Sequence, residues 1–179
     1  MNIKWVLSLA VLLTALSACA GTGTGRSTGE VVDDSVIATR TKSALLANSD
    51  TDGLNIDVEV DRGRVQLNGF VDSQSQIDRA GEIARDVPGA VSVENNLRVS
   101  DGGNRLAGEY IDDKAIQTKV AAALIDNPLA HKMKIDVEVN RGEVSLGGFV
   151  DSVEARDAAL DTARKVNGVV KVINNLTVR

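Results

Sequence analysis

One cysteine and one histidine limit the chemistry that this chain of 179 residues can perform. A nucleophilic triad or a general base at neutral pH normally needs a histidine, and the sequence offers His131 alone. A zinc-type site needs several His or Cys ligands that converge, and the sequence has no such group. His131 falls between a predicted helix and a predicted strand, where we expect a solvated side chain. The sequence therefore predicts a protein that is not an enzyme and that holds no metal or cofactor.

Carboxylates and glycines are the other residues that could carry chemistry. Asp57 with Glu59, and Asp136 with Glu138, alternate along predicted strands, and such pairs could act as acid and base. Charged residues on the outer face of a strand are usually solvated, and we expect that here. The glycines form neither a G-x-G-x-x-G turn nor a P-loop with its lysine, so we assign them to turns and close contacts.

Cys19 follows a segment with the pattern of an export signal. A basic start with Lys4 precedes an apolar run from Trp5 to Leu16, which is too short to cross a bilayer. The run ends in Leu16-Ser17-Ala18-Cys19, which looks like a bacterial lipobox, where the chain is cut before the cysteine and the thiol is alkylated with diacylglycerol. We predict a lipoprotein signal peptide over 1–18 and lipidation of Cys19. An ordinary secretory signal that ends near a cysteine is the alternative.

The lone cysteine favours the lipid anchor. An exported chain with one cysteine has no partner for a disulfide, and lipidation removes the free thiol. The residue after Cys19 is Ala20 and not Asp, which by resemblance to enterobacterial sorting favours the outer membrane. We expect a protein that is lipid-anchored on the periplasmic face of the outer membrane.

The rest of the chain is a tandem duplication with an offset of 79 residues, in which Ile37 matches Ile116 and about half of the aligned positions are identical. Residues 19–32 are rich in Gly, Thr and Ser and predict a flexible tether. Residues 101–111 contain Gly102-Gly103-Asn104 and predict a linker. We place one domain over 33–100 and a second over 112–179, each near the lower size at which one core suffices.

The hydrophobic periodicity changes in the same order within each copy. In the first copy, Asp33 can cap a helix with Ile37 on its apolar face, and alternating residues over 56–60 and 65–67 predict a hairpin. Asp72-Ser73 can cap a second helix, and a last strand is expected from Val91 to Val99. The second copy repeats this order from Asp112. The predicted fold class is α+β, with two tandem α-β-β-α-β modules, each a three-stranded mixed sheet packed on two helices.

Two asparagines and two glycines have expected structural roles in this scheme. Asn95 and Asn174 are in phase with core positions of the last strand, so we expect them to bond backbone groups there. Gly89 and Gly168 follow the second helix, where a left-handed turn without a Cβ penalty is expected.

Four segments of the duplicated part resemble the BON domains, named for bacterial osmoregulation and nodulation proteins. Gly63-Arg-Val-Gln-Leu-Asn-Gly69 and Gly142-Glu-Val-Ser-Leu-Gly-Gly148 are similar to the central G-x-V-x-L-x-G motif of that family. Residues 89–97 and 168–176 are similar to its closing strand. The resemblance covers Asp33 to Arg179 and implies no catalysis. It implies a dual-BON outer-membrane lipoprotein that binds anionic phospholipid and supports envelope integrity, or a soluble osmotically inducible relative with chaperone-like behaviour.

The two copies differ in charge. Residues 33–100 carry 12 acidic and 7 basic side chains, whereas residues 112–179 carry 10 of each. The whole chain has a net charge of −5, and aromatic residues make up 2% of it, so nucleic acid is an improbable partner class. Part of the difference is local, because Asp52, Gly53 and Asn55 of the first copy become His131, Lys132 and Lys134 in the second.

A lysine-rich region of the second copy is the predicted phospholipid site, and it consists of Lys114, Lys119, Lys132 and Lys134. Lysines near an anionic membrane are worth about 1 kcal/mol each, so an anchored protein could use a few of them. A solvated face is the alternative. Because the helix of copy two carries no aromatic anchor, we expect any contact to be mainly electrostatic. The competing function is a periplasmic chaperone or assembly factor for envelope proteins under osmotic stress.

Overall fold

A computed structural model describes residues 28–179 apart from 52, 101–106 and 131–132, and it describes only the backbone of 28–32 and 107–111. The predicted signal peptide, Cys19, His131 and Lys132 lie outside the described residues, as do most of the predicted tether and part of the predicted linker. Within the described part, no helix has the length and apolar character needed to span a bilayer.

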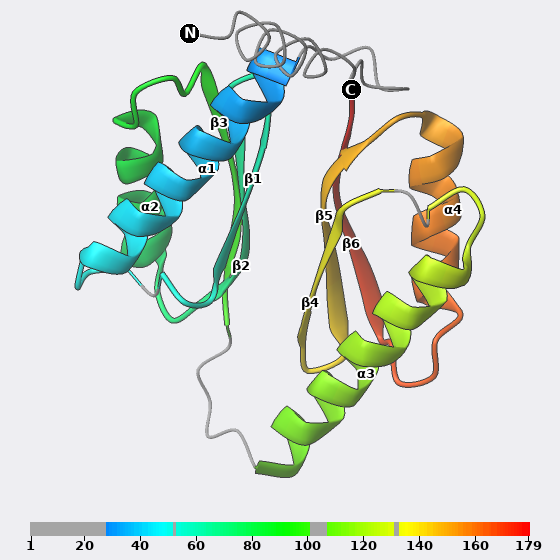
Figure 1. Cartoon of the computed structure of the whole chain (residues 1–179). Helices are drawn as coiled ribbons and strands as arrows, with labels where there is room; N and C mark the ends of the chain where they lie inside the picture. The colour runs from blue at the N-terminus through cyan, green and yellow to red at the C-terminus, as the bar shows by residue number, and fades with distance from the viewer. Residues whose placement is uncertain (1–27, 52, 101–106, 131–132) are drawn as a thin grey trace, which may run out of the picture.

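The two copies fold into two modules with the same order of elements (Figure 1). Module 1 consists of α1 (Thr28–Ala47), β1 (Ile56–Asp61), β2 (Arg64–Val71), α2 (Gln74–Arg85) and β3 (Ser92–Val99). Module 2 consists of α3 (Ala107–Asp126), β4 (Ile135–Asn140), β5 (Glu143–Val150), α4 (Val153–Arg164) and β6 (Lys171–Val178). The central strand of each sheet pairs antiparallel with the strand before it and parallel with the strand after it. The predicted α+β fold of two α-β-β-α-β modules is confirmed.

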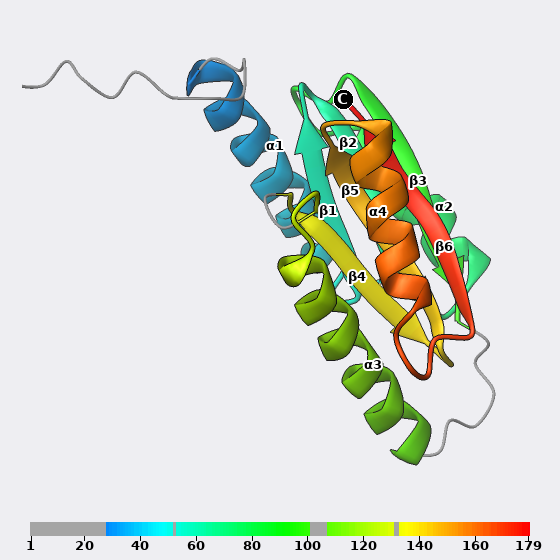
Figure 2. The ribbon, with the colours of Figure 1, turned by 90° about the vertical axis from the view of Figure 1, so that its right-hand side faces the viewer.

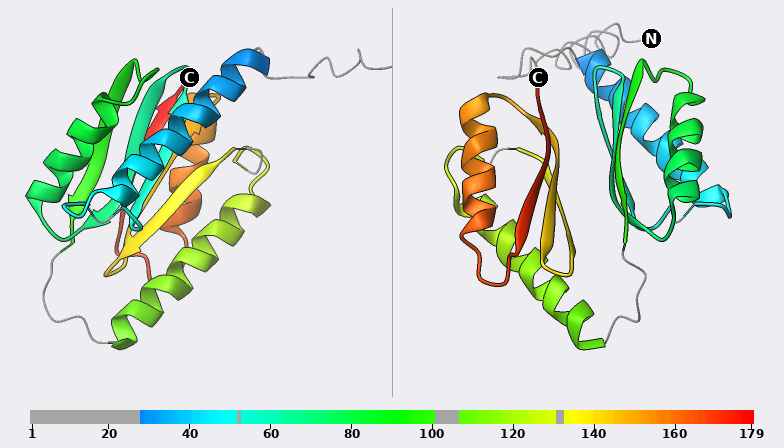
Figure 3. Two further views of the ribbon diagram at one scale, coloured as in Figure 1. Left: turned by 60° about the vertical axis from the view of Figure 1, so that its left-hand side comes forward. Right: turned by 180° about the vertical axis from the view of Figure 1, so that it is seen from behind.

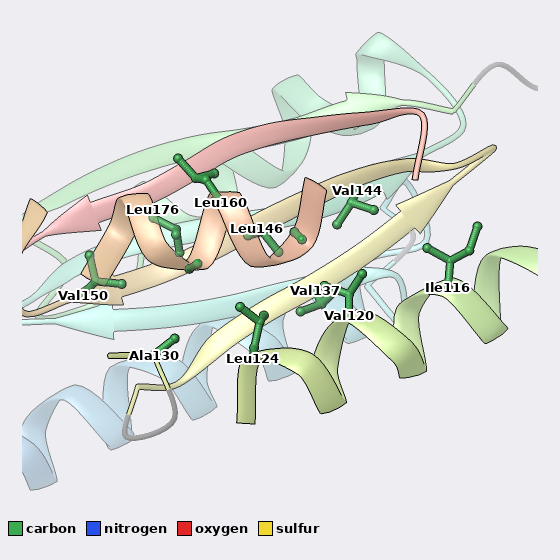
Figure 4. Close-up of a cluster of buried hydrophobic side chains, with 12 residues drawn as sticks. Ile116, Val120, Leu124, Ala130, Val137, Val144, Leu146, Val150, Leu160 and Leu176 are labelled. Carbon is green, nitrogen blue, oxygen red and sulfur yellow. The ribbon is translucent and has the colours of Figure 1, made fainter. Parts of the chain in front are cut away.

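Each module has its own apolar core between one face of its sheet and its two helices. Alternation along the central strand places Val144 and Leu146 of β5 on that face. Figure 4 shows them facing Val120 and Leu124 of α3 and Leu160 of α4. Module 1 has a separate cluster of the same kind. Full burial of one such side chain stabilises a fold by about 1.5–3 kcal/mol, so both modules have a basis for stability of their own.

The first helix of each module begins earlier than the sequence indicates. Asp33 and Asp112, predicted as caps, lie five residues inside helices that begin at Thr28 and Ala107. The capping prediction for these two residues is therefore wrong. The Gly, Thr and Ser content that predicts a tether over 19–32 also hides the first turn of α1.

The next residue, Asp34, is buried and joins α1 to the turn between β1 and β2. Its two carboxylate oxygens accept hydrogen bonds from the backbone N–H groups of Arg62 and Gly63, each at 2.9 Å. Both turn residues have positive φ, 53° and 73°, a hairpin geometry that glycine adopts freely and arginine does not. Asp113 forms the equivalent two bonds in module 2. A buried carboxylate therefore stabilises the strained turn in both modules.

The predictions for the second half of each module are confirmed with one displacement. Ser73 caps α2 by accepting a hydrogen bond from the backbone of the third residue after it, and the equivalent serine caps α4. Asn95 donates to the Ile77 carbonyl at 2.7 Å and accepts from a backbone N–H of its own strand. Asn174 accepts from the Leu176 N–H at 3.0 Å. The last strands begin one residue later than expected, and Val91 and Val170 precede them with 79% of each side chain exposed.

The modules pack against each other through the sheet faces that carry no helix. Figures 1 and 3 show the order of layers as helices, sheet, sheet and helices, and Figure 2 shows α3 and α4 covering the outer face of the second sheet. Strand β2 contacts β4 and β5, and β1 contacts β5. Both faces of each sheet are thus covered, one by helices and one by the other module.

Candidate membrane-contact site and the interface between the modules

Lys114 and Lys119 are both exposed on α3, but they face different sides of it. Five residues separate them, so their side chains are turned about 140° from each other around the helix axis. Lys114 Nζ donates to Gln117 at 2.9 Å, and its positive charge acts on the Glu138 carboxylate at the interface. Lys119 lines a groove beside Arg141 on another side of the module. The structure therefore does not bring these two lysines together.

Lys134 lies beyond the far end of α3, immediately before β4. From Lys114 to the end of the helix at Asp126 is 12 residues, or roughly 18 Å. The Lys134 side chain is 81% exposed, and its Nζ lies 2.7 Å from Glu59 Oε1 of module 1. The region where the copies differ in charge thus reaches both the molecular surface and the interface.

Two apolar side chains are exposed in the stretch of chain that leads from α3 to this lysine. Ile125, in the last turn of α3, is 69% exposed, and Leu129, in the following turn, is 54% exposed. We call Ile125, Leu129 and Lys134 the module 2 tip. Sequence reasoning missed this apolar pair because it looked for aromatic anchors inside the helix. The signal was present, since Ile125 lies about 100° around the helix from the buried Leu124.

Asn127 fixes the turn that carries the tip. Its Oδ1 accepts from the Leu129 N–H at 2.9 Å, and its Nδ2 donates to Thr162 Oγ1 of α4 at 2.7 Å. Asn48 accepts from the Asp50 N–H in the same way in module 1. The two modules therefore share the geometry of this turn while one presents leucine and the other aspartate.

The interface between the modules contains buried polar side chains, and residues at equivalent positions of the two modules differ in side-chain size. Asn68 of β2 is buried and lies over Gly147 of β5, its equivalent in module 2. A Cβ atom on Gly147 would collide with the Asn68 amide. Gln66 and its equivalent Ser145 are both buried and differ in the same sense. A large residue in module 1 thus meets a small one in module 2.

Gln66 connects the two central strands and the two last strands. Its Oε1 accepts from the Gly148 N–H at 2.8 Å, and its Nε2 donates to Glu94 at 2.9 Å and to Thr177 at 2.8 Å. Thr177 Oγ1 also donates to Glu94 at 3.0 Å. Because the side chain is fully buried, each of these bonds satisfies a group that water cannot reach.

Contacts at the border of the interface repeat in pairs. Arg179 of module 2 approaches Asp61 of module 1 to 3.9 Å, and the equivalent residues, Ser100 and Asn140, are joined by a hydrogen bond of 2.9 Å. An interface in which equivalent residues exchange places in this way has an approximate two-fold axis, like that of a symmetric dimer. The duplicated chain therefore folds as an internal dimer whose halves have diverged.

The carboxylates of β1 and β4 meet inside this interface. Asp57, Asp136 and Glu138 have carboxylate oxygens that all lie within 4.8 Å of one another, and each side chain is half-buried. The expectation that these residues and Glu59 are solvated is therefore wrong. Alternation along the strand correctly places them opposite the core, but it does not reveal that another module covers that face.

Burial changes the acidity of two of these groups. Removal from water is the largest cause that raises the pKa of Asp136 to about 7, and the negative charges of Asp57, Glu138 and Glu59 add to it. Burial and Asp57 likewise raise the pKa of Glu138 to about 7, against the opposing charge of Lys114. Hydrogen bonding to Asp57, in which the protonated Asp136 or Glu138 carboxyl is the donor, also favours the protonated form of both groups. Oxygen ligands of this kind would suit a hard cation, but the protonated carboxyls already bond to one another.

Comparison with known proteins agrees with the repeated architecture. The family model of the BON domain matches residues 33–101 and again residues 112–179. Osmotically-inducible protein Y of Escherichia coli (strain K12) is 34% identical over 148 residues, which are 83% of this chain and 74% of that protein. The 21 kDa hemolysin of Actinobacillus pleuropneumoniae is 40% identical over 150 residues, 83% and 75% of the two chains.

A third relative and a solved structure complete the comparison. The outer membrane lipoprotein DolP of Haemophilus influenzae is 29% identical over 150 residues, 83% of this chain and 76% of that protein. The C-terminal domain of CdsD, a structural protein of the type III secretion system of Chlamydia trachomatis, aligns with 82% of this chain and 67% of its own at 13% identity. Its TM-score is 0.33, which is too low to support an argument.

Proposed function

Because the chain belongs to the BON family, with one domain in each module, we propose that it is a non-enzymatic envelope lipoprotein that binds the surface of anionic phospholipid membranes. The family resemblance of the two glycine motifs is confirmed by the family match. The names of two relatives, an outer membrane lipoprotein and an osmotically inducible protein, support the coarser statement that this is an envelope protein. The lipid anchor at Cys19, the outer-membrane location and the role in envelope integrity belong to the proposal.

The observation that carries the proposal is the module 2 tip. Ile125 and Leu129 expose apolar surface in the segment that leads from α3 to the exposed Lys134, and a lipid surface of negative charge attracts both apolar and basic side chains. Burial of apolar surface contributes about 25 cal/mol per Å², and each lysine near the surface adds about 1 kcal/mol. The contact is then both apolar and electrostatic, which differs from the mainly electrostatic contact that the sequence predicts.

The position of α1 also supports an orientation in which the module 2 tip faces the membrane. Figure 1 shows that α1 begins at the end of the molecule toward which α3 runs, where β4 also starts. Thr28 is nine positions after Cys19, and a fully extended segment of that length spans at most about 32 Å. A lipid on Cys19 would therefore keep the module 2 tip near the membrane and raise its effective concentration there.

Vesicle binding tests this function directly. The chain from Ala20 onward, which lacks the lipid, is expected to bind vesicles with phosphatidylglycerol or cardiolipin, less strongly as salt rises, and not to bind neutral phosphatidylcholine vesicles. Replacing Lys132 and Lys134 by Ala is expected to weaken binding by about thirtyfold, since each lysine contributes about 1 kcal/mol. The matched control removes two exposed lysines elsewhere in module 2, Lys165 and Lys171.

Lys114 and Lys119 are tested in the same assay as a second pair. They remain part of the proposed lipid site, and their replacement by Ala is expected to weaken binding less, because they lie further along α3 from the tip. Equal binding to neutral and anionic vesicles, or no difference between the lysine pairs and their control, would contradict lipid contact through module 2.

A second candidate function follows from the 34% identity to osmotically-inducible protein Y. In this case the chain is a periplasmic chaperone or assembly factor for envelope proteins. Suppression of client aggregation by the lipid-free chain, unaffected by the lysine changes, would support this alternative. Inertness toward unfolded clients would count against it.

A further inference from the structure

We propose that the packing of module 1 on module 2 depends on protons: protonated Asp136 and Glu138, which lie beside Asp57, hold the two sheet faces together, and loss of their protons separates the modules. The three groups come from both sides of the interface, one from β1 and two from β4. Their oxygens lie within 4.8 Å of one another. Ionised carboxylates at this distance repel each other, and more strongly when half-buried than in water.

The other charged groups around this cluster do not neutralise it. Lys134 is already paired with Glu59 at 2.7 Å, and Glu59 itself adds negative charge beside Asp136. Lys114 of α3 opposes the repulsion at Glu138, but Glu138 still has a raised pKa. Asp61, Arg64, Glu94 and Arg179 lie at the border of the interface or among the last strands. Asp72 and Asp113 line a pocket with Glu138, and Lys42 of α1 donates to the Ile56 carbonyl, next to Asp57.

The rest of the interface is largely polar. Its buried side chains include Gln66, Asn68 and Ser145, and Phe149 of β5 and Ile173 of β6 are buried apolar side chains that belong to neither core. Polar contacts of this kind exchange protein partners for water at small net gain. The apolar cores lie on the other faces of the sheets and are separate in the two modules. Both modules can therefore remain folded when the interface opens.

The direction of the pH effect follows from linkage. The carboxyls of Asp136 and Glu138 have pKa values of about 7 in the packed form, against 3.8 and 4.5 for ordinary exposed groups. The packed form therefore binds more protons than the separated form. Its stabilisation is fully present below about pH 4 and is lost as the pH rises through about 7. For each proton bound, the ratio of packed to separated molecules falls about tenfold per pH unit between about pH 5 and 7.

Distances between spin labels on the two modules test this proposal. The chain from Ala20 onward contains no cysteine, so cysteines introduced at the exposed positions Asp86 and Lys165 can be labelled alone. Asp86 directly follows α2 of module 1, and Lys165 directly follows α4 of module 2. We expect one narrow distance at pH 5 and a second, broad population of longer distances that grows at least tenfold relative to it per pH unit up to about pH 7. All buffers contain EDTA, so that no divalent cation can replace the protons.

Charge-neutral variants separate protonation from other effects of pH. Asp136→Asn with Glu138→Gln imitates the protonated side chains, and it is expected to keep the narrow distance at pH 9. The control, Glu82→Gln with Asp161→Asn, removes the same charge from exposed helix positions and is expected to open like the unmodified chain. Identical distance distributions at pH 5 and pH 9 in the unmodified chain would overturn the proposal, and this result needs no variant to fold. Opening of the Asp136→Asn, Glu138→Gln variant at pH 9, with its circular dichroism unchanged, would overturn it too.

Discussion

Asp34 and Asp113 each hold together segments that are far apart in the sequence. Each carboxylate accepts two backbone N–H bonds from a turn 28 or 29 residues away. In both modules the first turn residue is an arginine with positive φ, at 53° and 52°. This conformation costs a residue with a Cβ about 1 kcal/mol or more, and the charged acceptor offsets that cost. The sequence places two adjacent aspartates here, and periodicity alone cannot tell which of them is buried.

The neighbouring aspartates allow a matched test of this role. Asp34→Ala leaves one buried and one part-buried backbone donor without their charged acceptor, so we expect it to lower the free energy of unfolding by about 2–4 kcal/mol. Asp33→Ala removes the same charge from an exposed position inside α1 and is expected to change it by less than about 0.5 kcal/mol. Urea unfolding followed by circular dichroism measures both. Equal losses in the two variants would contradict a specific role for the Asp34 carboxylate at the turn.

The elements could largely be predicted from the sequence, because their burial follows local periodicity. Alternation over 56–60 and 65–67 and the cap at Ser73 gave the hairpin and second helix of module 1, and β1, β2 and α2 confirm them. The start of α1 could not be predicted, because its first turn has the Gly, Thr and Ser composition of a tether. The sequence predicts the helix α3, but it does not predict which side chains are exposed at the end of that helix, since the exposed Ile125 is as apolar as the buried residue before it.

Substitutions at the module 2 tip test whether this end of α3 contacts lipid. Ile125→Ser and Leu129→Ser remove side chains that are already exposed, so we expect little change in thermal stability. If each buries about half of its apolar surface in the membrane, each loss is worth about 1 kcal/mol, or roughly a fivefold weaker affinity for phosphatidylglycerol vesicles. Leu46→Ser, at the position equivalent to Ile125 in module 1, is the control and is expected to leave binding unchanged. Vesicle co-sedimentation measures all three, and a similar loss from Leu46→Ser would argue against a specific role for module 2.

The arrangement of the two modules is the level that the sequence did not predict. The repeat implies two similar cores, and the charge difference between the copies suggests different surfaces. Neither observation indicates that the sheets face each other. The information lies in positions where the copies differ in size, such as Gln66 against Ser145 and Asn68 against Gly147. Near an approximate two-fold axis a residue meets its own equivalent, so a large side chain on one copy requires a small one on the other.

This requirement gives a prediction about the whole molecule. Gly147→Asn makes the two copies identical at this position and places a side chain where the Asn68 amide lies, so we expect the modules to separate even at pH 5. Overpacking of this kind typically costs 1–3 kcal/mol, which lowers the ratio of packed to separated molecules by about 5- to 150-fold. Distances between spin labels at Asp86 and Lys165 measure that ratio.

The reciprocal exchange distinguishes a fit between the modules from damage within one of them. Asn68→Gly combined with Gly147→Asn moves the large residue to the other side of the axis, and we expect it to restore most of the packed population. Asn68→Gly alone removes the collision partner but leaves a gap, so it is expected to weaken packing less than Gly147→Asn does. If the combined variant is as open as Gly147→Asn alone, the asparagine disturbs module 2 itself, and size complementarity at the axis is not what joins the two sheets.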